Sequence, residues 1–170
     1  MVEQAQVMEQ TVETSGGRAG KYLTFTLAKE DYGIEILKVK EIIGMIRITP
    51  IPRTPDYVKG VINLRGRIIP VLDLRTRFGM DQADYTERTC IIVVELRVEK
   101  GQVVLGVVVD SVSEVLNVKP EEIEGNLEFG AEVDTDYILG LAKMSGGVKI
   151  LLDIDRALSA EEISLVEKTA

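Results

Sequence analysis

Short alternating and apolar runs, separated by polar segments, predict a chain made mainly of strands. Residues 22–27 alternate, with three apolar side chains on one face, so they predict a strand that is followed by a hairpin turn at 29–31. Residues 32–43 are rich in β-branched side chains and contain a glycine. We predict a strand there that is interrupted by a single helical turn at Leu37 and Lys38.

The segment 60–75 (GVINLRGRIIPVLDLR) predicts a compact unit of two strands and a short helix. An exposed turn over 63–66 joins the strands, and the second strand runs from Arg67 to Leu72. Pro70 lacks an amide donor, which indicates an edge strand, a bulge or a point where the strand leaves its ladder. Asp73 is placed to cap a helix whose inward residues would be Leu74 and Phe78.

The same unit recurs 80 positions later in the chain. Tyr57 corresponds to Tyr137, and Leu64 is matched by Met144; the identical pairs at this offset also include Gly60 with Gly140, Gly66 with Gly146, and Asp73 with Asp153. The spacing therefore predicts closing strands over 137–144 and 148–152. A chance match is the alternative, since a few identities at one offset can be selected by eye.

A second block repeats at an offset of 73. Residues 32–43 correspond to 105–116, and the matched pairs are Gly33 with Gly106, Val39 with Val112, and Glu41 with Glu114. The change of offset places seven extra residues in the acidic segment 118–136. The chain therefore predicts two copies of one small β unit, with further strands over 89–98 and 102–116 around a turn at 99–101.

These elements predict a mainly β fold and one domain over 22–158, built from two subdomains at about 22–80 and 89–158. Residues 1–21 are polar and predict a disordered tail, and 81–88 predict the hinge between the copies. The capping-box pattern at 159–162 predicts a C-terminal helix within 159–170. No apolar run reaches the length of a membrane span, and the N-terminal residues show no secretion signal.

Composition excludes several kinds of chemistry. The 170 residues contain no histidine, so no Ser-His-Asp or Cys-His pair can form, and a single cysteine, Cys90, precludes an internal disulfide. Cys90 precedes an apolar run and predicts a buried strand thiol, which suits a reducing cytoplasm. We expect no catalytic residues, metal or cofactor, and the net charge of −8 argues against nucleic acid as the main partner.

Charge is unevenly distributed along the chain. Residues 47–77 contain seven basic side chains against two acidic ones, whereas 121–136 contain seven acidic side chains and no basic one. Solvated loops of opposite sign are the simpler interpretation. The other is a pair of complementary patches for protein partners, which would allow weak head-to-tail self-association in rings.

Residues 32–39 (YGIEILKV), 60–66 (GVINLRG) and 70–75 (PVLDLR) resemble the CheW family of chemotaxis coupling proteins, and the likeness runs from about residue 22 to 166. The resemblance implies two packed SH3-like five-stranded barrels. It also implies a non-catalytic adaptor that joins the cytoplasmic tip of chemoreceptors to the regulatory domain of the histidine kinase CheA. Such a protein would act in the cytoplasm, at the inner face of the membrane through receptor arrays, without direct membrane insertion.

The resemblance also implies two binding surfaces. A receptor helix would lie in a groove between the barrels, at positions that match Val39, Gly60, Arg65, Ile91, Val112 and Gly140. Kinase contacts would fall on the outer faces of the barrels, at Glu41, Ile42, Ile123, Glu124 and Phe129.

The residue types fit a helix-in-groove arrangement. Val39 and Val112 occupy equivalent positions and could line the groove from opposite sides, and Arg65 could bind a receptor carboxylate or be a solvated turn residue. Gly60 and Gly140 are explained as well by bulges or close backbone approach as by binding.

Other functions remain open from sequence alone. The chain could be a small carboxylate enzyme that uses Asp73 with Asp110, although helix capping and strand ends explain such residues. It could also be a detached CheA-regulatory-like or other CheW-like signalling module. A small-ligand barrel is less favoured, because barrels of this size are filled by their own side chains.

Overall fold

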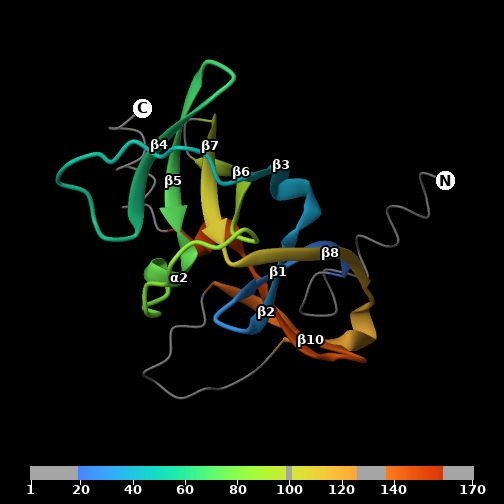
Figure 1. Ribbon diagram of the computed structural model, residues 1–170. Helices are drawn as coiled ribbons and strands as arrows, with labels where there is room; N and C mark the ends of the chain where they lie inside the picture. Colours follow the sequence, from blue (N-terminus) through green and yellow to red (C-terminus); the bar gives the residue numbers. More distant parts are fainter. Residues whose placement is uncertain (1–18, 99–100, 126–136, 159–170) are drawn as a thin grey trace.

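The computed structural model describes residues 19–98, 101–125 and 137–158, and strands dominate this part of the chain (Figure 1). One sheet has six strands in the order β8-β1-β2-β11-β10-β9, and the other has five in the order β3-β6-β7-β5-β4. The prediction of a mainly β fold is confirmed. The first sheet has one strand more than the five that were expected, namely the two-residue strand β9. The strands of this six-stranded sheet are β1 (Gly20–Leu27), β2 (Glu30–Glu35), β8 (Ser111–Val118), β9 (Ile123–Glu124), β10 (Ile138–Met144) and β11 (Gly147–Leu152).

The five-stranded sheet is formed by consecutive strands of the chain. They are β3 (Val39–Gly44), β4 (Val58–Leu64), β5 (Arg67–Asp73), β6 (Cys90–Val98) and β7 (Gly101–Val109). Short helices follow β5 and β11, namely α2 (Leu74–Arg77) and α3 (Ile154–Ala157), and the 3₁₀ turns are η1 (Ile36–Lys38) and η2 (Pro120–Glu122). The predicted helical turn between two strands is therefore present as η1.

The chain passes from one sheet to the other at two points. The first crossover is η1, which leads from β2 in the six-stranded sheet to β3 in the five-stranded sheet. The second crossover is the single residue Asp110, which leads from β7 back to β8. The boundaries of the sheets thus differ from the predicted ones at 22–80 and 89–158. Each copy contributes its first hairpin to the sheet of the other copy, through the parallel pairs β2–β11 and β7–β5.

The internal repeat has a structural counterpart in matching backbone irregularities. The β4–β5 pair shifts register between Val58 and Gly60, and the β10–β11 pair shifts between Ile138 and Gly140. After each pair of strands, the backbone amide of an aspartate donates a hydrogen bond to the tyrosine at the start of the repeated unit. Asp73 N donates to the Tyr57 carbonyl at 2.7 Å, and Asp153 N donates to the Tyr137 carbonyl at 2.8 Å. Both aspartates cap the helix that follows, as predicted for Asp73.

Two local expectations need adjustment, and one is narrowed. The first hairpin turns at Ala28 and Lys29, both with positive φ, so residues 30 and 31 already belong to β2. β1 begins at Gly20, two residues inside the predicted tail. Pro70 lies in a strand with neighbours on both sides, but the parallel ladder with β7 begins only at Val71. The missing amide of Pro70 therefore falls where the ladder starts, which was one of the three alternatives.

In the described ranges, apolar side chains form three cores. The largest contains Phe25, Ile34 and Leu152 from the six-stranded sheet together with Ile92 and Leu105 from the five-stranded sheet, so it lies between the sheets. A second core belongs to the five-stranded sheet and a third to the six-stranded sheet. Burial of this shared apolar surface is the main force that holds the two sheets together.

A stack of four aromatic rings reinforces this junction. Neighbouring ring centroids are 5.9 Å apart for Phe25 and Tyr32, 6.3 Å for Tyr32 and Phe78, and 5.2 Å for Phe78 and Tyr137. Phe78 directly follows α2, so it inserts from the five-stranded side between two rings of the other side. Burial, aided by the nearby charge of Glu30, raises the pKa of Tyr32, which keeps its hydroxyl neutral.

Several sequence predictions fall outside the described residues. They are the N-terminal tail as far as residue 18, the turn residues 99 and 100, most of the acidic segment at 126–136, and the C-terminal helix from residue 159. Within the described ranges, no helix is both long enough and apolar enough to cross a membrane.

Candidate protein-binding surface

Two equivalent strands form the exposed edges next to the junction of the sheets. β3 lies at one edge of the five-stranded sheet and β8 at one edge of the six-stranded sheet. Val39 on β3 and Val112 on β8 are each half-buried and pack against the core between the sheets. The two valines, which the repeat pairs, therefore both lie at the junction of the sheets.

Each edge strand is irregular directly after its valine. Val39 pairs with Val94 but Glu41 pairs with Val93, so β3 has one extra residue at Lys40. On β8, Val112 pairs with Phe25 and Val115 with Leu23, which leaves two residues opposite Thr24. Such bulges bend a strand and change the direction of its side chains.

The buried hydroxyl of Thr24 provides hydrogen bonds to backbone groups at the bulge on β8. It donates to the Glu114 carbonyl at 2.7 Å and accepts from the Glu114 amide at 3.1 Å. Both backbone groups would otherwise lack the partner that a regular ladder provides. Thr24 is 1% exposed, so water cannot replace it.

Gly60 and Gly140 are buried beneath short strand segments. A Cβ on Gly60, whose φ is +139°, would lie 2.0 Å from the Thr49 carbonyl oxygen. A Cβ on Gly140 would lie 2.8 Å from the Ile123 side chain and 2.9 Å from the Glu124 carbonyl oxygen. Close backbone approach therefore accounts for both glycines. Neither glycine offers a side chain to a partner.

Ile91 is also inaccessible. Its side chain is fully buried in the core of the five-stranded sheet, so it supports the surface from beneath. Arg65, by contrast, lies in the β4–β5 turn with φ of 53° and a side chain 71% exposed. Of the six predicted receptor positions, only Val39, Arg65 and Val112 present a side chain that solvent reaches.

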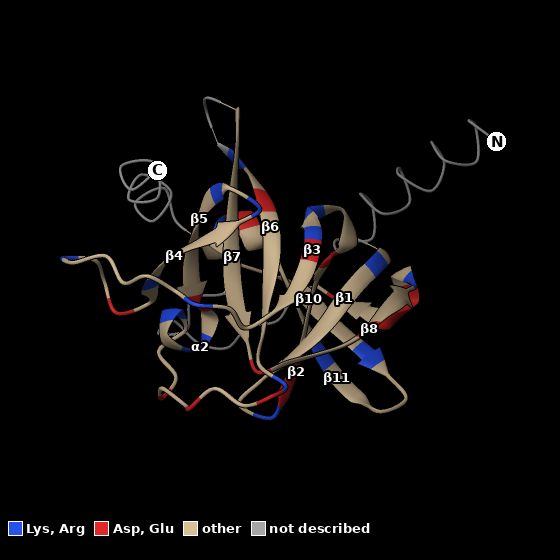
Figure 2. Cartoon of the chain, turned by 45° about the horizontal axis from the view of Figure 1, so that its top comes forward, with Lys and Arg blue, Asp and Glu red and all other residues tan. Residues whose placement is uncertain are grey.

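Arg65 forms an ion pair with Glu41, one of the residues predicted for the kinase surface. Glu41 lies on β3 and Arg65 follows β4, and these two strands are the opposite edges of the five-stranded sheet. The pair can form only because the sheet curls until its edges meet. Figure 2 shows acidic and basic residues next to each other along β3, whereas β7 contains no charged residue.

The remaining kinase positions are separated in space by their sheets. Ile42 is 42% exposed on β3. Ile123 is half-buried on β9, and next to it the exposed Glu124 accepts a hydrogen bond from Lys143 Nζ at 2.8 Å. That bond lowers the pKa of Glu124. Phe129 lies outside the described residues.

A pocket borders each crossover. The one beside Asp110 has a volume of about 450 Å³ and is lined by Glu87, Arg88, Cys90, Ser111, Val112 and Ser113. The one beside η1 has a volume of about 110 Å³, and the first residues of β1 line it together with Ile36 and Leu37. Cys90 is a half-buried free thiol that donates to the Arg88 carbonyl at 3.0 Å, so it is less buried than the sequence suggested.

The carboxylates considered for an enzyme already serve the fold. Asp73 is 3% exposed and its Oδ1 accepts from the Arg75 amide at 2.9 Å. Asp110 accepts two hydrogen bonds from Arg75 and one from the Ala28 amide. Among the described residues, no cluster of three or more acidic or cysteine side chains could hold a metal ion.

Sequence reasoning did not place four charged residues at the junction, namely Lys38, Arg75, Asp110 and Asp155. Arg75 pairs with Asp110, and Lys38 pairs with Asp155. A signal for them was present, since Arg75 and Asp155 both lie two residues beyond a capping aspartate and are separated by the repeat offset of 80.

Comparisons with known proteins point to one family. Residues 21–162 match the model of the CheW-like domain. The chain is 45% identical over 150 residues to chemotaxis protein CheW of Klebsiella aerogenes, with 88% of each chain covered. It is 34% identical over 143 residues to chemotaxis protein CheW of Treponema pallidum, with 83% of each covered.

A solved structure agrees with these sequence matches. The crystal structure of the scaffolding protein TtCheW from Thermoanaerobacter tengcongensis superimposes with a TM-score of 0.73 at 34% sequence identity. The superposition covers 85% of this chain and 95% of that one.

Proposed function

This chain belongs to the CheW-like family and is a coupling scaffold of chemotaxis signalling, and we propose that it joins chemoreceptors to the histidine kinase CheA through two separate surfaces. The observation that carries the proposal is the placement of Val39 and Val112 on equivalent edge strands along one junction. Because receptor tips lie on the cytoplasmic side of the membrane, this scaffold would work there.

The receptor surface consists of the half-buried Val39 and Val112 with the exposed Arg65. An amphipathic receptor helix would place its apolar face against the two valines, where water is displaced from partly covered side chains. Arg65 would bind a carboxylate of the receptor and so fix the helix in register. Gly60, Gly140 and Ile91 would support this surface without touching the partner.

The kinase surface consists of Glu41 and Ile42 on the five-stranded sheet and of Ile123 and Glu124 on the six-stranded sheet, with Phe129 added from the sequence. Apolar side chains beside charged ones suit a protein interface, in which the apolar centre gives affinity and the rim gives specificity. The two halves lie on different sheets, so they fit separate kinase-domain copies. Self-association through the basic and acidic segments stays a prediction.

An amide-shift titration by NMR tests the proposal. The labelled protein is titrated with a receptor-tip helical hairpin and, separately, with a CheA regulatory domain. We expect the hairpin to shift the amides of Val39, Arg65 and Val112, and the kinase domain to shift those of Ile42, Ile123 and Glu124. Identical shifts from both partners, or none from either, would contradict two separate surfaces.

A charge reversal on the β4–β5 hairpin provides a matched pair of variants. Arg65→Glu should weaken receptor binding about tenfold or more, because a charge-assisted hydrogen bond contributes roughly 1.5–3 kcal/mol. Arg67→Glu makes the same change on an exposed residue two positions away and should leave receptor binding within about twofold. Equal losses in the two variants would point to net charge alone.

A further inference from the structure

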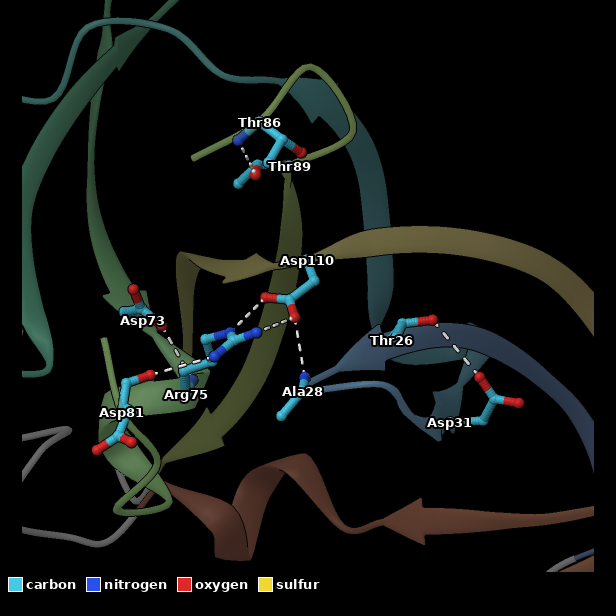
Figure 3. A network of polar contacts seen from close by, with 9 residues as sticks. All are labelled: Thr26, Ala28, Asp31, Asp73, Arg75, Asp81, Thr86, Thr89 and Asp110. Atoms are coloured by element: carbon cyan, nitrogen blue, oxygen red, sulfur yellow. Dashed lines mark hydrogen bonds and ion pairs between the residues drawn. The ribbon is translucent and has the colours of Figure 1, made fainter. Parts of the chain in front are cut away.

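Both crossovers between the sheets are held by an ion pair. At the second crossover, Arg75 binds the Asp110 carboxylate with two hydrogen bonds, from Nε at 2.7 Å and from one terminal nitrogen at 2.6 Å (Figure 3). The same carboxylate accepts from the Ala28 amide at 2.8 Å, and the Asp110 amide donates to the Thr26 carbonyl at 3.0 Å. Asp110 thus links α2, which follows β5 of the five-stranded sheet, to the β1–β2 hairpin of the six-stranded sheet.

At the first crossover, Lys38 forms an ion pair with Asp155 of α3. The other oxygen of this carboxylate accepts from the Arg97 amide near the end of β6, at 3.2 Å. Asp155 therefore links α3, which follows β11 of the six-stranded sheet, to η1 and to the β6–β7 hairpin of the five-stranded sheet.

The two ion pairs are equivalent but have opposite polarity. Asp155 follows Arg75 by the offset of 80, and Asp110 follows Leu37, the neighbour of Lys38, by the offset of 73. At one crossover the helix supplies the cation, and at the other it supplies the anion. All four side chains are only 20–29% exposed, so salt screens these pairs less than it screens pairs on an open surface.

Each ion pair lies beside one of the two half-buried valines. Lys38 directly precedes Val39, and Asp110 precedes Val112 by two residues. We propose that the pairs Arg75–Asp110 and Lys38–Asp155 are positioning pairs for receptor binding, because they fix the distance between Val39 and Val112 by locking both points where the chain changes sheets. This inference rests on the receptor surface proposed above.

The physical argument is one of preorganisation. The core between the sheets is apolar, and apolar burial is non-directional, whereas a two-point hydrogen bond between Arg and Asp has a defined geometry. If loss of one pair leaves about a tenth of the molecules with the binding-competent spacing, the apparent Kd for the receptor rises about tenfold. The kinase residues Ile123 and Glu124 lie on β9, at the opposite edge of the six-stranded sheet from β8, so kinase affinity should change less than receptor affinity.

The first experiment measures affinities of charge variants. Arg75→Asp places two carboxylates together, and we expect a rise of about tenfold in the Kd for a receptor-tip hairpin. The double variant Arg75→Asp with Asp110→Lys copies the polarity of the other pair and should restore most of the affinity. Binding of a CheA regulatory domain should stay within about twofold in both variants, and Arg67→Asp is the exposed charge control.

The second experiment measures the spacing of the sheets directly. Ile68 and Val148 are exposed, equivalent residues on β5 and β11, so spin labels on Ile68→Cys and Val148→Cys report one distance between the sheets in a Cys90→Ser background. We expect Arg75→Asp to broaden the distance distribution and the double variant to narrow it again. A lower melting temperature with an unchanged distribution would overturn the inference, because it would indicate a purely stabilising role.

The outcomes separate this inference from the proposed function. If the wild-type protein fails to bind the hairpin, the receptor surface is wrong, while the distance measurement still tests whether the pairs set the spacing. If the wild-type protein binds and the pair variants bind equally well, only the positioning role is wrong. Should Arg75→Asp fail to fold, Asp155→Asn at the other crossover makes the same test with a milder change.

Discussion

The guanidinium of Arg65 and the carboxylate of Glu41 form an ion pair across the two edges of the five-stranded sheet. Sequence comparison had assigned these residues to different surfaces, one for the receptor and one for the kinase. Their contact means that the two proposed surfaces meet at one point of the barrel. A receptor carboxylate that binds Arg65 would have to share it with Glu41 or displace it.

The first prediction concerns the competition between Glu41 and a receptor carboxylate for Arg65. Glu41→Gln should strengthen receptor-hairpin binding by about two- to fivefold, because an exposed ion pair contributes roughly 0.2–1 kcal/mol that the receptor no longer has to overcome. Calorimetric titration at low and moderate salt measures the change, which should shrink as salt rises. Weaker receptor binding in this variant would show that Glu41 orients Arg65 and does not compete for it.

The second prediction concerns Gly60. Gly60→Ala should lower the free energy of unfolding by about 3 kcal/mol or more, because the new Cβ would overlap the Thr49 carbonyl and the backbone would be strained at φ +139°. The mutual hydrogen bonds between Thr49 and Val61, at 2.8 and 2.9 Å, prevent the loop from moving aside. Urea denaturation measures the change.

Gly146→Ala is the matched control. Gly146 lies in the β10–β11 turn, and a Cβ there would meet nothing within 4 Å. We expect its free energy of unfolding to stay within about 0.5 kcal/mol of wild type. A comparable loss in both variants would contradict the close approach to Thr49 as the cause, because Gly146 has no close neighbour and the lower chain entropy of an unfolded alanine variant would favour folding.

The repeat offsets in the sequence were sufficient to locate most of the fold. They correctly paired Tyr57 with Tyr137 and Val39 with Val112, because turn glycines, capping aspartates and strand alternation are local signals. They could not show which sheet receives each hairpin. That choice depends on parallel pairing between distant strands, such as Tyr32 with Ile150, which no local pattern specifies.

The candidate site could be predicted in part for the same reason. The equivalence of Val39 and Val112 follows from the repeat, whereas the burial of Ile91 and the role of Arg75 depend on packing between the sheets. The contact between Arg65 and Glu41 requires the sheet to curl, so the sequence could not reveal it.

The third prediction tests the bulge on β8. Thr24→Val removes both hydrogen bonds to Glu114 and should cost about 1–3 kcal/mol of unfolding free energy, since the amide and the carbonyl of Glu114 lose their partner. It should also shift the amide signal of Val112, which lies directly before the bulge. Thr26→Val, on a less buried position of the same strand, should cost less than 1 kcal/mol, roughly the value of one weak hydrogen bond.

The last prediction concerns the dependence of stability on pH. Partial burial alone would raise the pKa of Asp110, but the hydrogen bonds from Arg75 and from the Ala28 amide outweigh it and hold that pKa below its ordinary value of 3.8. Between these two values the unfolded chain binds more protons at this site than the folded chain does. The contribution of Asp110 to stability is therefore complete above about pH 4 and is lost as the pH falls through its lowered pKa.

Two variants isolate this contribution. Asp110→Asn should be less stable than wild type at neutral pH, and its stability should fall less steeply as the pH drops below about 4. Arg75→Gln should remove only part of the slope, because the Ala28 amide still favours the charged carboxylate. Urea denaturation from pH 7 down to about pH 2.5 provides both curves. If Asp110→Asn keeps the acid slope of the wild type, carboxylates elsewhere govern the acid sensitivity, and the pair with Arg75 contributes no measurable stability of its own.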